Sequence, residues 1–136
     1  MADIKFSPRC FGCGPDNPIG LHLQIRHGEW AAQADWLVTE NYVSYDRTLH
    51  GGIIATMADE LMGHVTPDRQ EVVVTAHLEV DFLAAARLGD TLRCAARMTS
   101  LGRRSIHTEA VITAGGKVLA KARGVYVRMP GGNQKG

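Results

Sequence analysis

Asp59 is the residue whose surroundings most clearly indicate chemistry. It lies within residues 53–65, where Ala, Met, Leu and Glu favour a helix and apolar residues cover most of the helix circumference. The helix is therefore expected to be largely buried. A buried carboxylate without a partner is costly, and it is tolerated most readily where the group takes part in catalysis. From the residues alone, the alternative is that Asp59 pairs with an arginine or caps a neighbouring backbone.

The segment His50-Gly51-Gly52 directly precedes this helix. The first N–H groups of a helix lack intrahelical partners and carry the positive end of its dipole. Because two glycines leave these groups unshielded, the position could bind an anion or stabilise the oxyanion of a carbonyl under attack. We expect Asp59 to lie within reach of this helix start. The alternative is a glycine loop that needs positive φ angles, with His50 packed against it.

Small residues recur along one face of the predicted helix. At 3.6 residues per turn, one stripe contains Gly52, Thr56, Asp59 and Gly63, and only Asp59 in it is charged. Such a stripe allows another body to approach the helix closely.

Three cysteines, Cys10, Cys13 and Cys94, are a further source of possible chemistry. Their odd number argues against a disulfide framework. The CxxC of Cys10 and Cys13 could be half of a zinc site or a redox pair, but a zinc site needs two more ligands. No second CxxC or HxxxH is present, and the nearby His22 and His27 have no familiar spacing. We therefore expect a glycine-rich turn with free or buried thiols, no metal and no cofactor.

Composition limits the class of protein. The chain has 136 residues, of which 45% are hydrophobic and 21% charged, with a net charge of +1. These values predict one globular domain and argue against broad nucleic-acid binding, which would need a basic excess. No apolar run approaches the roughly 20 residues of a membrane helix. Residues 1–5 lack the apolar core of a secretory signal, so a cytoplasmic location is expected.

The elements that must hold these residues follow from periodicity and turn residues. Residues 1–20 are predicted to form a Gly/Pro-rich lead-in with tight turns, and residues 21–129 a single domain. Residues 21–25 and 30–38 are predicted to form a hairpin with its turn near 27–29, followed by a loop over 39–48. Pro67 ends the one helix. Four strands in a meander are predicted at 71–84, 90–100, 104–114 and 117–129, and a flexible tail at 130–136.

This layout predicts how the sheet and the helix pack. One face of a sheet of about six strands must be covered, and a single helix can cover it if the sheet curls around it. The other face must meet solvent or another subunit.

The sequence resembles the hotdog-fold thioesterases, in the branch of the phenylacetate-pathway (PaaI-like) thioesterase and the similar 4-hydroxybenzoyl-CoA thioesterase. The resemblance spans about residues 10–128, and its diagnostic part is the block from His50 to Asp59. It also includes segments 10–21, 76–86, 88–90, 102–104 and 117–120. It implies an α+β hotdog fold, a curled antiparallel sheet wrapped around one central helix. It further implies a homodimer, or a dimer of dimers (homotetramer), with active sites between subunits.

The resemblance also implies roles for individual residues. Asp59 matches the acid that assists water attack on a thioester carbonyl, or attacks it directly. The N–H of Gly51 polarises that carbonyl. His50 matches a loop histidine near the thioester, and Thr75 matches a strand hydroxyl that positions water across the dimer. Gly52 belongs to the same substrate-binding loop.

The loop before the HGG segment departs from the family pattern. The family often has Asn or Gln six or seven residues before this segment, where Val43 or Ser44 stands here, and Ser44 is the candidate substrate contact. Arg47 occupies a position that is often Gly. These departures concern water positioning and acyl-group contacts.

The predicted function is hydrolysis of an acyl-CoA thioester. No GxSxG elbow supports a serine triad, so Asp59 acts as general base or nucleophile, and the sequence leaves both open. Arg103 and Arg104 are candidates for the CoA phosphates, with ordinary strand-edge charges as the alternative. Candidates for the acyl pocket are apolar residues that could equally be plain core: Ile54, Met57 and Phe82.

Three rival functions remain from the sequence. A non-catalytic acyl-CoA binding protein would not need a carboxylate near a neutral thioester. A hotdog hydratase or dehydratase would need an acid–base pair such as His50 and Asp59. A small structural interaction protein is the third. No sequence pattern indicates the length of the acyl chain. None indicates whether the acyl group is carried by CoA or by an acyl carrier protein.

Overall fold

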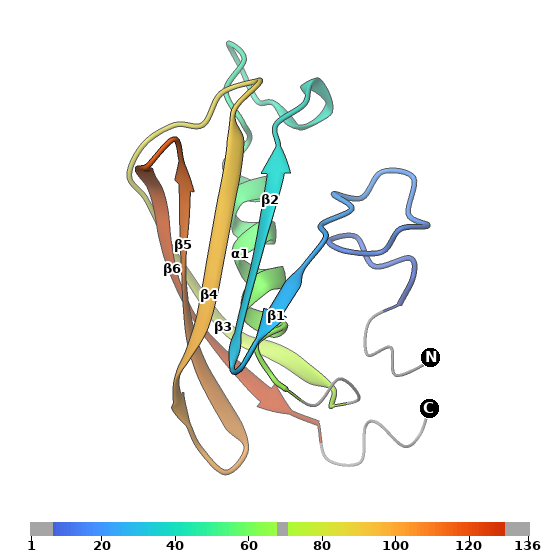
Figure 1. Ribbon diagram of the computed structural model, residues 1–136, viewed down its shortest axis with the longest axis vertical. Coiled ribbons are helices and arrows are strands. Elements are labelled where there is room, and N and C mark those ends of the chain that lie inside the picture. The colour runs from blue at the N-terminus through green and yellow to red at the C-terminus, as the bar shows by residue number, and fades with distance from the viewer. Residues whose placement is uncertain (1–6, 68–70, 130–136) are drawn as a thin grey trace.

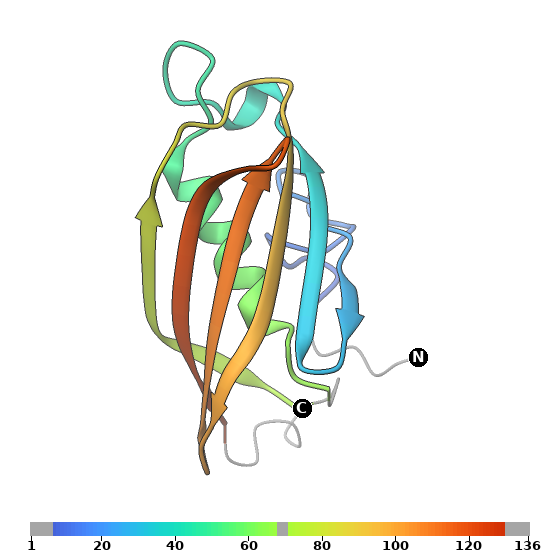
Figure 2. The same cartoon turned by 60° about the vertical axis from the view of Figure 1, so that its left-hand side comes forward.

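A curled antiparallel sheet surrounds a helix in the computed structural model, which describes residues 7–67 and 71–129 (Figure 1). In chain order the elements are β1 (Arg26–Gly28), β2 (Ala31–Leu37), the 3-10 turn η1 (Glu40–Tyr42), α1 (Gly51–Gly63), β3 (Val73–Phe82), β4 (Thr91–Leu101), β5 (Ser105–Ala114) and β6 (Lys117–Arg128). Helix α1 lies across the concave face of the sheet (Figure 2). This is the hotdog fold that the resemblance implies, so the predicted fold is confirmed.

The strand order is β1-β2-β4-β5-β6-β3, with every neighbouring pair antiparallel. The predicted meander is confirmed for β4, β5 and β6, and is wrong for β3, which pairs with β6 at the far edge. The connection from β3 to β4 crosses the end of the sheet where α1 begins, where Ala86 accepts from Leu49 N–H and Gly89 N–H donates to Val38. Placing β3 at the far edge allows the sheet to close around both sides of α1.

The first predicted strand is also wrong. Residues 21–25 form no strand, β1 comprises the three residues that follow, and the turn lies at residues 29–30. Leu21 and Leu23 are buried as their alternation predicts. Their N–H groups, however, donate to the carbonyls of Phe11 and Gly12, both at 2.9 Å. The alternation of apolar and polar residues over 21–25 therefore reflects burial of the leucines against the core. The backbone of the lead-in, rather than a neighbouring strand, accepts the hydrogen bonds of this segment.

Helix α1 begins at Gly51, two residues before the predicted helical segment that starts at residue 53. His50 caps it, because its Nδ1 accepts the N–H of Gly52 at 2.8 Å. Gly51 and Gly52 are helical, and neither has a positive φ, so the alternative of a strained glycine loop is wrong. The face towards the sheet consists of fully buried apolar residues, which confirms the buried helix: Ile54, Met57, Ala58, Leu61 and Met62.

The turn between β5 and β6 follows the prediction. Gly115 and Gly116 have φ angles of +57° and +83°, which suit a tight hairpin. The predicted tail at 130–136 lies outside the described residues, as do residues 1–6 of the lead-in. Among the described residues, no helix is long and apolar enough to cross a membrane.

Candidate active site

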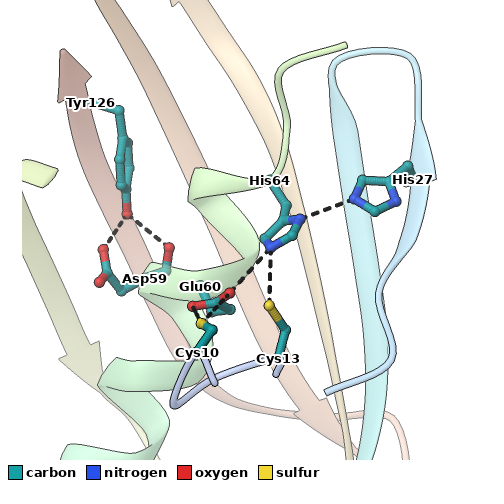
Figure 3. A network of polar contacts seen from close by, with 7 residues as sticks. All are labelled: Cys10, Cys13, His27, Asp59, Glu60, His64 and Tyr126. Carbon is teal, nitrogen blue, oxygen red and sulfur yellow. Dashed lines mark hydrogen bonds and ion pairs between the residues drawn. The ribbon is translucent and has the colours of Figure 1, made fainter. Parts of the chain in front are cut away.

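The Asp59 carboxylate accepts hydrogen bonds from two hydroxyl groups on two strands. The Tyr126 hydroxyl of β6 donates to Oδ1 at 2.6 Å (Figure 3). Thr75 Oγ1 of β3 donates to the same oxygen at 2.9 Å. Within residues 7–67 and 71–129, Asp59 forms no ion pair. The alternative that Asp59 is a structural partner of an arginine is therefore wrong for the described chain.

A small cavity opens beside this carboxylate. Its volume is about 70 Å³, and its lining includes Asp59, Glu60, Gly63, Thr75 and Tyr126. One water molecule needs roughly 10–15 Å³ of such space, so the cavity can hold water next to the carboxylate. Thr75 contacts Asp59 of its own chain, whereas the resemblance implied a strand hydroxyl acting across a dimer.

Tyr126 is the contact that sequence reasoning missed, because a buried tyrosine in a strand is usually plain core. The available signal was Gly124, two residues earlier on the same face of β6. A Cβ atom at Gly124 would lie 2.6 Å from Cε1 of Tyr126, so glycine leaves room for the ring. Burial raises the pKa of Tyr126, and the Asp59 carboxylate raises it further. The phenol therefore stays protonated and remains a donor to Asp59.

The raised pKa of Tyr126 predicts a loss of stability in alkali. Because the folded state holds this proton more tightly than the unfolded state, the stabilisation is complete below the ordinary pKa of 10.0 and decreases as pH rises above it. We expect Tyr126→Phe to show a smaller fall in Tm above that pH than the parent, measured by circular dichroism. The matched control is Tyr45→Phe, since Tyr45 is 75% exposed. An alkaline fall as steep in Tyr126→Phe as in the parent would contradict this assignment.

The start of α1 presents one free amide. The N–H of Gly52 is taken by His50, whereas the N–H of Gly51 donates to no acceptor in the described part of the chain. Because His50 Nδ1 accepts a hydrogen bond, the neutral ring carries its proton on Nε2. Gly51, rather than Gly52, is thus the donor available to a ligand, and the Nε2–H of His50 is a second one beside it.

The helix itself separates this amide from the carboxylate. Gly51 and Asp59 are eight residues apart, which corresponds to about 12 Å at 1.5 Å rise per residue. The expectation that Asp59 lies within reach of the helix start is therefore wrong inside one chain. The two groups can act on one carbonyl only if they come from different chains.

The other predicted substrate residues divide between the two ends of the molecule. Ser44 lies in the loop that leads to the helix start, where Oγ donates to the Thr48 carbonyl at 3.2 Å. In the same loop Arg47 has a φ of +62°, a conformation that explains why glycine suits this position. Arg103 and Arg104 are exposed in the β4–β5 turn, at the opposite end, where α1 ends. The structure therefore does not bring these arginines to Gly51 of the same chain.

The three apolar candidates for the acyl pocket differ in their exposure to solvent. Ile54 and Met57 are buried in the core, so they follow the alternative role as plain core. Phe82, at the end of β3, is 54% exposed. Its ring lies beside the helix start, since a Cβ atom on Gly51 would be 3.5 Å from Cε1 of Phe82. Phe82 is the apolar candidate that a ligand at Gly51 can contact.

Comparisons with known proteins agree with this architecture. The family model described as "Thioesterase superfamily" matches residues 47–121. The Pseudomonas aeruginosa protein PA0474, whose name assigns it provisionally to the esterases, is 33% identical over 92 residues, which cover 65% of this chain and 69% of that protein.

Two solved structures share the fold. The PaaI protein of the phenylacetic acid degradation operon of E. coli has a TM-score of 0.75 and 24% identity, covering 80% of each chain. A Streptococcus pneumoniae protein described as a hypothetical thioesterase with coenzyme A has a TM-score of 0.74 and 22% identity, covering 79% of this chain and 88% of that one. The fold defines a hotdog protein. The family match is more specific: this chain belongs to the thioesterase superfamily.

Proposed function

We propose that the protein hydrolyses an acyl-CoA thioester to a free acid and CoA. The observation that carries the proposal is Asp59, a carboxylate that has no ion-pair partner among the described residues, is held by two hydroxyl groups and adjoins a cavity large enough for water. Two comparisons support a thioester as the substrate class: the match to the thioesterase family model, and the similar Streptococcus pneumoniae structure that is described as being with coenzyme A.

The proposed reaction uses Gly51, His50 and Asp59 in distinct roles. The thioester oxygen accepts the Gly51 N–H, which makes the carbonyl carbon electrophilic and stabilises the oxyanion that forms. Asp59 removes a proton from water as the water oxygen bonds to that carbon, or Asp59 attacks the carbon first. The C–S bond then breaks and CoA leaves as a thiolate. In the general-base route the thiolate takes up the proton that Asp59 removed from water. In the nucleophilic route the thiolate is protonated by solvent, and a water molecule then hydrolyses the anhydride formed on Asp59, which releases the free acid and restores the carboxylate. His50 Nε2–H lies next to the polarising amide and can donate to the bound thioester.

Each site in this proposal is shared between two protomers of a homodimer. Strand β3 is an edge of the sheet, and an edge strand leaves backbone groups unpaired unless another element covers it. Large apolar side chains are exposed on and just after it: Val74, Phe82 and Leu83. Pairing β3 with its two-fold copy makes the two α1 helices antiparallel. Asp59 of one protomer then approaches Gly51 of the partner subunit.

The same arrangement gives Arg103 and Arg104 a function. They lie at the end of the sheet where α1 ends, and an antiparallel partner brings its own helix start towards that end. The two guanidinium groups could then hold the phosphates of CoA while the partner's amide holds the thioester.

A panel of thioesters tests the proposed function. We expect the purified protein to release free thiol from at least one of short, medium, long or aryl acyl-CoAs, followed with a thiol reagent. Hydration of an enoyl-CoA, without thiol release, would instead establish the hydratase alternative. Tight binding of acyl-CoA with no turnover of any substrate would establish the binding protein.

A further inference from the structure

A second polar cluster lies on the other side of α1 from the Tyr126–Asp59 contact (Figure 3). It joins the CxxC of the lead-in to Glu60, in the last turn of α1, and to His64, the residue that caps the end of this helix. Cys10 Sγ lies 3.5 Å from Glu60 Oε2, and Cys13 Sγ lies 3.6 Å from His64 Nε2. The Glu60 and His64 side chains meet at 3.1 Å and are only 13% and 9% exposed. The ligand atoms of Cys10, Cys13 and Glu60 all lie within 4.8 Å of one another.

The geometry points to a metal site, and we propose that Cys10, Cys13, Glu60 and His64 bind a divalent zinc-like ion. Zinc bonds of about 2.3 Å to sulfur and 2.0–2.2 Å to nitrogen or oxygen place tetrahedral ligands roughly 3.4–3.8 Å apart. The contacts of 3.5 and 3.6 Å fall in this range, and the 3.1 Å contact lies slightly below it. His64 lies outside the group of three whose ligand atoms are all within 4.8 Å of one another, so binding of one ion by all four residues requires the side chains of Cys10 and His64 to move closer together. Two thiolates with an imidazole and a carboxylate favour zinc over calcium or magnesium, which prefer oxygen ligands.

The lead-in is folded to bring its cysteines to the helix. A Cβ atom on Gly12 would lie 2.5 Å from Glu60 Oε1, so glycine is needed for the CxxC to approach that carboxylate. The next glycine, Gly14, closes the turn by donating to the Cys10 carbonyl at 2.8 Å. A Cβ atom on Gly14 would lie 2.4 Å from the Cys10 nitrogen. Two close approaches in five residues hold the two sulfur atoms in place.

The imidazole of His64 is also oriented towards the cluster. His27 Nε2 of β1 contacts His64 Nδ1 at 3.0 Å, which leaves His64 Nε2 directed at Cys13 and Glu60. A hydrogen bond to the second ring nitrogen is the usual way in which proteins fix a metal-binding histidine. The sequence argued against a metal because two ligands were missing, and the end of α1 with its cap residue His64 supplies two candidates.

The proposed ion would connect the lead-in to the part of α1 that carries the candidate acid. Glu60 follows Asp59 directly and also lines the cavity beside it, so a closed four-ligand site would fix one wall of that cavity together with the end of the helix. The proposed ion has a structural role, and the proposal stands independently of the proposed hydrolysis.

The test is a metal measurement on the full chain. We expect protein purified under reducing conditions without chelator to contain one zinc per chain by mass spectrometry. Replacement by Co²⁺ should give a thiolate-to-cobalt charge-transfer band and the strong visible bands of tetrahedral cobalt. Cys13→Ser and Glu60→Gln should weaken or abolish the bands and lower Tm.

The matched control is Cys94→Ala, which removes the third cysteine. Cys94 is fully buried in β4, and among the described residues it belongs to no cluster whose ligand atoms could share an ion. This variant should keep the metal and the cobalt spectrum. If the reduced parent chain contains no stoichiometric metal and gains no charge-transfer band with Co²⁺, the proposal is wrong. It is equally wrong if Cys13→Ser retains the parent's cobalt spectrum.

Discussion

Replacing Asp59 with asparagine should reduce kcat for thiol release by about 10²–10⁴-fold, the range that a positioned general base contributes. Asparagine retains an oxygen that can accept the hydrogen bonds of Thr75 and Tyr126, so the local structure should persist. It cannot take a proton from water or form an anhydride with the acyl group. The measurement is steady-state thiol release with the best substrate of the panel, together with Tm.

The matched control for this variant is Asp35→Asn. Asp35 lies on the outward face of β2, where it pairs with Arg26 and Arg93. Exposed ion pairs of this kind contribute little to stability. We therefore expect kcat and Tm close to those of the parent. Thiol release by Asp59→Asn at the parental rate would show that another group activates the nucleophile.

Replacing Gly51 with proline should reduce kcat by about 10²–10³-fold, the usual effect of removing one oxyanion-hole donor. Proline has no N–H, and the first position of a helix is where it is best tolerated. The preceding residue also suits it, because His50 has a ψ of 131°, within the roughly +120° to +160° that precedes proline. Tm should therefore change little while catalysis is lost.

The matched control here is Gly51→Ala, which adds bulk but keeps the N–H. A Cβ atom at this position would meet Phe82 at 3.5 Å, an ordinary contact. We expect most of the activity to remain in Gly51→Ala. Equal losses in the alanine and proline variants would mean that bulk, rather than the missing donor, causes the effect, and that the Gly51 N–H polarises nothing.

The sequence was informative where local patterns decide the structure. The apolar, Ala- and Met-rich segment predicted α1, and Gly115-Gly116 predicted the β5–β6 hairpin, because both depend on residues close together in the chain. The far-edge position of β3 was not predictable in this way. It depends on how the sheet closes around the helix, which is a property of the whole domain. The strand assigned to residues 21–25 failed because buried alternation does not show which backbone supplies the hydrogen bonds.

The candidate site was predicted in part for the same reason. Asp59, His50 and Gly51 form a local pattern along one helix, so spacing and resemblance could indicate them. Tyr126 reaches Asp59 from a strand 67 positions later in the chain, and Glu60 and His64 meet the CxxC across about 50 residues. Contacts at such separations leave at most an indirect sign in one sequence, such as the glycine at position 124 that leaves room for the Tyr126 ring. The about 12 Å between Gly51 and Asp59, by contrast, follows from helix geometry alone.

Mixing two inactive variants tests the shared site most directly. Asp59→Asn and Gly51→Pro chains, co-expressed with different tags or unfolded and refolded together, should form mixed dimers. In a mixed dimer, one site combines the intact Asp59 of one chain with the intact Gly51 of the other. Random pairing in a two-fold dimer should then restore about a quarter of the parental thiol release. If the mixture stays as inactive as the separate variants, while the tags show that mixed dimers have formed, the shared site is contradicted.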